Sequence, residues 1–200
     1  RSVLGIRPLL WKNGWPVAGE VFKEGTYEIE SERRGYALEL AVDFVRMEYT
    51  RHRFWEKDDT PVVPLKSQTL EDVIGTWPQG KINVRIGDYM FRPHQKWTIT
   101  AVPDGGGYLG GPYYKIVIEG TNRALAATAD AEVVTVPEFT GTPEQLWRID
   151  QLTDGTYRIM PKEVPGTDKE LVLVSVGDST PSLGEFDMNS DNSKWNFRDH

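Results

Sequence analysis

Aromatic residues outside the regularly alternating segments are the residues of this sequence best suited to bind a ligand. Tyr49 and Trp55 stand in a long segment rich in charged residues, and Tyr108 stands in the glycine-rich loop 105–111, with Tyr113 beside it. A ring that the fold leaves exposed can stack on the apolar face of a ligand. The competing interpretation is packing, because the rings of the long segment could also dock on a neighbouring domain.

Other chemistries lack a matching pattern. The chain has no cysteine and only three widely separated histidines, which argues against disulfides, thiolate nucleophiles and a histidine-rich metal site. Asp187, Asn189 and Asp191 alternate as oxygen ligands of calcium would, but the glycine and terminal glutamate of an EF-hand loop are missing, so we expect a surface turn. The loop 105–111 precedes no Gly-Lys-Ser/Thr, and no Gly-x-Ser-x-Gly is present. We therefore predict no cofactor, no metal and no catalytic residue.

Length and charge set further limits. Two hundred residues suit one domain with a small appendage, and the net charge of −7 disfavours binding to nucleic acid or to an anionic membrane surface. No apolar run approaches the roughly 18 residues that span a bilayer. Because the chain begins at Arg1 instead of methionine, we expect a mature or excised piece whose signal peptide is gone.

Three tryptophans mark an internal repeat. Trp97, Trp147 and Trp195 lie 50 and 48 residues apart, and the first two stand in the pattern Gln-x-Trp. The segment 84–93 aligns without a gap to 134–143, again 50 residues later. We therefore expect three copies of one structural unit, each with its indole in the core and its glutamine bonded to the backbone of its own repeat.

The repeats consist of short segments that alternate between apolar and polar residues, which indicates half-buried β-strands. Glycine and proline fall mostly between these segments, as turns require. The best helical window is short, near Leu70–Ile74, with Thr69 as its N-cap. The first repeat carries an insertion over about 43–80, a candidate functional loop or packing surface.

The triplicated unit resembles the ricin-type β-trefoil lectins and related carbohydrate-binding modules, whose repeats end in Gln-x-Trp. The resemblance implies an all-β chain with a β-trefoil over 21–200 and an N-terminal arm over 1–20. Sugar sites of that family pair an aspartate shortly after an aliphatic run with a stacking aromatic, whereas Glu39 of the first repeat is the longer glutamate. The leucines matched between repeats are Leu38, Leu125 and Leu171, and a carboxylate follows only the first.

This departure predicts one surviving sugar site, in the first repeat, and puts a lectin of the standard kind in doubt. The residues that the resemblance selects as hydroxyl acceptors are Glu39 and Asp43, with Tyr49, Trp55 or Tyr108 as stacking platforms. The competing role for Asp43 is turn formation, because aspartate bonds readily to nearby backbone.

A second resemblance covers the start of the chain. The segment 9–17, Leu-Leu-Trp-Lys-Asn-Gly-Trp-Pro-Val, resembles the end of the catalytic propeller of glycoside hydrolase family 43 arabinanases. It implies a non-catalytic module of a bacterial enzyme that is secreted, periplasmic or on the cell surface, with arabinan or arabinoxylan as the bound polysaccharide and the catalytic domain as a partner. Two alternatives stay open, namely a buttress domain without sugar binding and a trefoil inhibitor or protein-interaction module.

Overall fold

The computed structural model describes residues 9–12, 15–18, 21–33, 36–42, 69–108, 111–176 and 180–199. Six strands form a closed barrel, because each pairs with two others and β14 returns to β3. The barrel strands are β3 (Gly25–Ser31), β6 (Trp97–Tyr108), β7 (Gly111–Ile118), β10 (Trp147–Gln151), β11 (Tyr157–Pro161) and β14 (Trp195–Asp199).

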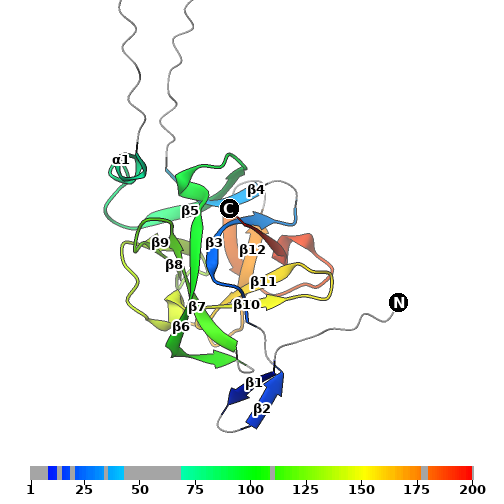
Figure 1. Cartoon of the computed structure of the whole chain (residues 1–200). Coiled ribbons are helices and arrows are strands. Elements are labelled where there is room, and N and C mark those ends of the chain that lie inside the picture. The colour runs from blue at the N-terminus through cyan, green and yellow to red at the C-terminus, as the bar shows by residue number, and fades with distance from the viewer. Residues whose placement is uncertain are drawn as a thin grey trace, which may run out of the picture.

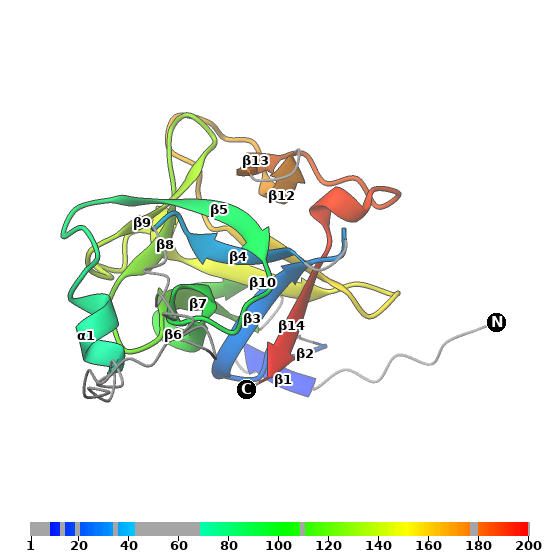
Figure 2. The same ribbon diagram turned by 90° about the horizontal axis from the view of Figure 1, so that it is seen from above.

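Three hairpins cap one end of the barrel (Figures 1 and 2). They are β4 (Tyr36–Leu40) with β5 (Ile82–Asp88), β8 (Ala124–Ala127) with β9 (Val133–Val136), and β12 (Val172–Val176) with β13 (Thr180–Gly184). Short 3-10 turns precede three barrel strands, at Pro93–Gln95, Pro143–Gln145 and Asp191–Ser193. Repeat 1 thus comprises β3 to β6, repeat 2 comprises β7 to β10 and repeat 3 comprises β11 to β14, which confirms the predicted β-trefoil.

The repeat tryptophans are core residues, as predicted, and each is fully buried. Their indole nitrogens donate to one backbone carbonyl in each cap hairpin, at 2.8–2.9 Å, and the acceptors are Leu38, Leu125 and Leu173. The prediction that Leu171 is the third matched leucine was therefore wrong by two residues. Val174 then follows the matched leucine, so repeat 3 still lacks a carboxylate there.

The residues two positions before these tryptophans hold the neighbouring loops by hydrogen bonds to the backbone, as predicted for the glutamines. Gln95 accepts a hydrogen bond from the Met90 N–H at 2.9 Å, and Gln145 accepts one from the Thr140 N–H at 2.7 Å. In repeat 3, which lacks the glutamine, Ser193 donates to a backbone oxygen instead. Each loop is thereby held by a buried side chain, which fixes where its exposed residues lie.

The predicted short helix is α1 (Leu70–Ile74), and Thr69 forms its capping box with Asp72. The end of the predicted insertion is fastened to repeat 2. The buried Arg123 donates to the carbonyls of Pro78 and Gly80 at 2.8 and 2.7 Å. At the N-terminal side, β1 (Leu9–Lys12) and β2 (Trp15–Ala18) form a separate hairpin, seen at the bottom of Figure 1.

Phe22 closes the end of the barrel opposite the cap. Its ring packs against the tyrosines at equivalent positions of the three repeats and against Phe197, with centroid distances of 4.5–6.1 Å. The tyrosines are Tyr27, Tyr114 and Tyr157. The Tyr114 hydroxyl accepts from the Phe22 N–H at 2.7 Å and donates to the Phe22 carbonyl. Phe22, which precedes the first repeat, thus fills the space on the pseudo-threefold axis.

We predict that Phe22→Ala lowers the free energy of unfolding by about 3 kcal/mol, because removing a buried phenyl ring leaves a cavity. Urea unfolding followed by tryptophan fluorescence measures this change. The neighbouring Val21, whose side chain is 55% exposed, supplies the control, and Val21→Ala should change stability by less than about 0.5 kcal/mol. Equal effects of the two substitutions would contradict the assigned role of Phe22.

Candidate functional site

Glu39 of β4, a predicted hydroxyl acceptor, is buried, with a side chain only 2% exposed. Arg85 donates to one carboxylate oxygen at 2.6 Å, and Gln95 donates to the other at 2.6 Å. His94 Nε2 lies 3.2 Å from that second oxygen. The geometry therefore favours a structural role for Glu39 over the predicted contact with sugar hydroxyls.

The electrostatics of this cluster agree with that role. Burial alone would raise the pKa of Glu39, but its contacts with His94, Arg85 and Gln95 outweigh burial and lower the pKa below the ordinary value of 4.5. Gly87 makes room for the carboxylate, since a Cβ there would lie 2.5 Å from the Glu39 Cδ. The sequence analysis missed these three partners because they follow Glu39 by 46 to 56 residues.

The other predicted site residues are not tested by this structure. Asp43, Tyr49 and Trp55 lie outside the described residues. Tyr108 is the last residue of β6, where its backbone pairs with Gly111, and its side chain is outside the described part. Their contacts with sugar stay predictions.

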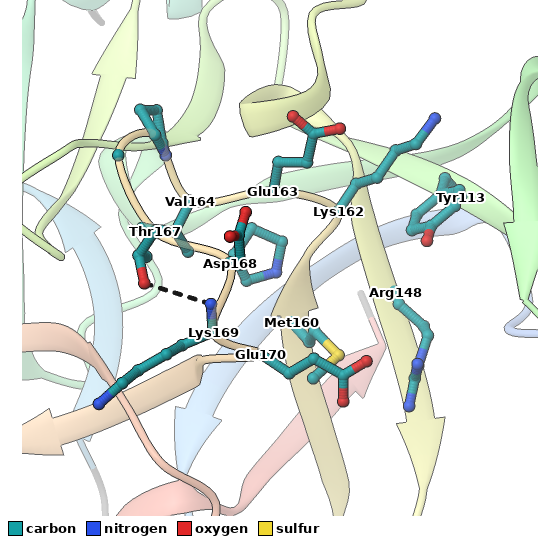
Figure 3. A pocket seen from close by; sticks show the side chains of 13 residues that line it. Tyr113, Arg148, Met160, Lys162, Glu163, Val164, Thr167, Asp168, Lys169 and Glu170 are labelled. Carbon is teal, nitrogen blue, oxygen red and sulfur yellow. Dashed lines mark hydrogen bonds between the residues drawn. The ribbon is translucent and has the colours of Figure 1, made fainter.

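A polar surface cleft of about 780 Å³ lies where repeats 2 and 3 meet (Figure 3). Tyr113 of β7 and Arg148 of β10 form one side of it. The end of β11 and the loop 162–170 form the rest. This volume accommodates a small ligand, such as one or two sugar rings.

Tyr113 is the aromatic surface of the cleft. Its side chain is partly buried, and the Lys162 Nζ lies 5.2 Å from the ring centroid. Lys162 is itself held by a 2.8 Å hydrogen bond to the Gly105 carbonyl. Burial raises the pKa of Tyr113, so at neutral pH the hydroxyl is a protonated group that can both donate and accept. In Figure 3 this hydroxyl points toward Arg148.

Charged side chains line the same cleft and could bond to sugar hydroxyls. Arg148 donates to Asp150 at 2.7 Å, which fixes its guanidinium at the cleft. Exposed carboxylates of the loop also line the cleft, at Glu163, Asp168 and Glu170. Donors, acceptors and an aromatic ring thus converge from three elements, a combination that suits a ligand with hydroxyl groups around an apolar face.

Among the residues that the structure describes, no group of three or more His, Cys, Asp or Glu side chains is placed to hold a metal ion. None of the helices described is long and apolar enough to cross a membrane.

The fold defines the protein as a β-trefoil. Within it, residues 93–181 match the model of a family described as "Ricin-type beta-trefoil lectin domain-like". The match spans the whole of repeat 2 and part of each neighbouring repeat, somewhat less than half of the chain.

Solved structures show the same fold at low sequence identity. A mosquitocidal holotoxin matches with a TM-score of 0.59 and 14% identity over 90% of this chain, and the lectin of Polyporus squamosus bound to an influenza-binding epitope matches with 0.57 and 16% over 89%. An exo-beta-1,3-galactanase from Clostridium thermocellum matches with 0.54 and 15% over 92%.

This chain spans only 18% of the holotoxin, 50% of the lectin and 32% of the galactanase, so it corresponds to a part of each of them. A comparison with curated proteins found no match.

We predict that Glu39→Gln destabilises the protein by about 3 kcal/mol at pH 7, because Arg85 and His94 lose a charged partner. The lowered pKa of Glu39 means that its carboxylate contributes stability above pH 4.5 and loses this contribution as the pH falls through the folded-state value. Thermal unfolding of both proteins across pH 3–7 tests this, and the two stability curves should converge at the acid end. Glu132→Gln, at an exposed position, is the control and should show no such convergence.

Proposed function

We propose that this chain is a non-catalytic carbohydrate-binding module. The observation that carries the proposal is the cleft of Tyr113 on a β-trefoil, which is lined by this partly buried ring, by Arg148 and by a set of carboxylates. A sugar has a C–H face that can cover an aromatic ring and hydroxyls that pair with charged side chains. The match to the lectin-domain model and the likeness to a lectin with a bound glycan support the same function.

We further propose that the module belongs to a polysaccharide-degrading glycoside hydrolase that acts on arabinan or arabinoxylan. The support is the resemblance of residues 9–17 to the end of an arabinanase propeller, and the likeness of this chain to about a third of a galactanase. Such a polymer stays outside the cell, so the proposed role requires a secreted, periplasmic or surface-bound protein.

A structural buttress of the same enzyme is the second candidate. The buried cluster around Glu39 favours it, because the carboxylate that the family resemblance selects for sugar binding is bonded within the protein. In that case, the trefoil would stabilise its neighbour without binding glycan of its own.

We predict that electrophoresis of the chain is retarded in gels containing arabinan, arabinoxylan or β-1,3-galactan. Tyr113→Ala should weaken the binding about tenfold, the factor that corresponds to about 1.4 kcal/mol of lost stacking energy. Phe139→Ala removes a partly buried ring away from the cleft and is the control that should bind as the unmodified protein does. No retardation in any gel, with an intact unfolding transition, would contradict the proposal and favour the buttress.

A further inference from the structure

The loop after β5 contains an exposed aromatic residue in a conformation that suits glycine. Phe91 has a φ of 54°, in the left-handed region that a side chain with a Cβ disfavours. The ungapped alignment of repeats 1 and 2 places Gly141 at the same position, and its φ is 78°. Two repeats therefore share one backbone conformation, which a glycine adopts without strain and a phenylalanine does not.

Burial does not explain the strained residue. Phe91 is 59% exposed and Met90 beside it is 42% exposed, so much of their apolar surface faces water. The Phe91 ring lies against Tyr89, with 4.3 Å between centroids and a near-perpendicular orientation. Residues with a strained backbone cluster where proteins contact ligands, so the exposed ring of Phe91 and its neighbour Tyr89 are a candidate binding surface.

Charged groups border this pair of rings. The Arg198 guanidinium lies 4.4 Å from the centroid of Tyr89, and an ion pair with Glu30 at 3.0 Å holds it there. The Arg198 side chain remains 53% exposed, so it can still donate to a ligand. Similar cation–aromatic pairs occur in the other repeats, between Lys115 and Phe139 and between Arg158 and Phe186. At the position where repeat 1 adds Phe91, however, repeat 2 has only Gly141.

We propose that Phe91, Tyr89 and Arg198 form a second glycan-binding surface, separate from the Tyr113 cleft; this inference rests on the proposed function. The ligand is a neutral sugar unit, whose C–H face stacks on Phe91 while its hydroxyls bond to Arg198. The opposite charges of Arg198 and Glu30 compensate each other, which disfavours an acidic sugar. The exposed apolar surface consists of Phe91 and Met90 within a charged rim, which is small for the core of a protein–protein interface.

The decisive substitution is Phe91→Gly, which removes the ring and relieves the backbone. The midpoint of thermal unfolding should stay within about 2 °C or rise, because strain relief offsets the lost contact with Tyr89. Retardation in the arabinan, arabinoxylan and β-1,3-galactan gels should weaken about fivefold to tenfold. Unchanged binding would overturn the proposal, and so would a midpoint lowered by more than about 5 °C, since the ring would then serve the fold.

Two comparisons separate this inference from the function on which it rests. If the unmodified chain is not retarded, both fail. If it is retarded and Tyr113→Ala weakens binding while Phe91→Gly does not, only the second surface fails. In repeat 2, Gly141→Ala imposes a backbone strain like that of Phe91, and a Cβ at this position has open space around it. This substitution should lower the midpoint of thermal unfolding without changing binding.

Discussion

Three buried indole hydrogen bonds tie the barrel to its cap, and the rest of the structure depends on them. Each joins a barrel strand to the cap hairpin of the same repeat, and each indole is fully buried. A buried N–H without a partner costs about 1–3 kcal/mol, so barrel and hairpins cannot shift relative to each other without losing these bonds. The pairs are Trp97 with Leu38, Trp147 with Leu125 and Trp195 with Leu173. They fix the ends of the loops, and thereby the places where ligand-binding residues can stand.

The tryptophan spacing and the alternating segments predicted this fold, yet they did not determine every register. In repeat 3, the run Leu171–Val174 alternates between two aliphatic residue types, so a shift of two residues keeps the same face buried. The sequence alone could not choose between Leu171 and Leu173. The indole bond chooses, because only the Leu173 carbonyl lies within reach of Trp195.

The candidate site was harder to predict than the fold, because side chains converge from separate elements. Glu39 has the residue type and position of a sugar acceptor, but Arg85 and Gln95 reach it from the neighbouring strand and the following turn. Tyr113 was recognisable as a loop-side aromatic, whereas nothing in the spacing connected it with Arg148 or Glu170. Phe91 had a signal that the sequence analysis did not use, since the ungapped repeat alignment sets it against Gly141.

The indole hydrogen bonds of the core are repeated three times, whereas the charged positions of the barrel strands differ between repeats. Adjacent barrel strands show this at one register position, where Arg198 of β14 lies opposite Glu28 of β3, whereas Asp150 of β10 lies opposite Arg158 of β11, so the signs of the charges are exchanged. Two facing residues of opposite charge can exchange positions and remain oppositely charged, whereas no other side chain has both the shape and the N–H donor of the indole. Charged positions outside the shared core therefore differ from repeat to repeat. It follows that binding surfaces on this trefoil need not recur with its symmetry, and a search confined to equivalent positions would miss both the Tyr113 cleft and the rings at Phe91.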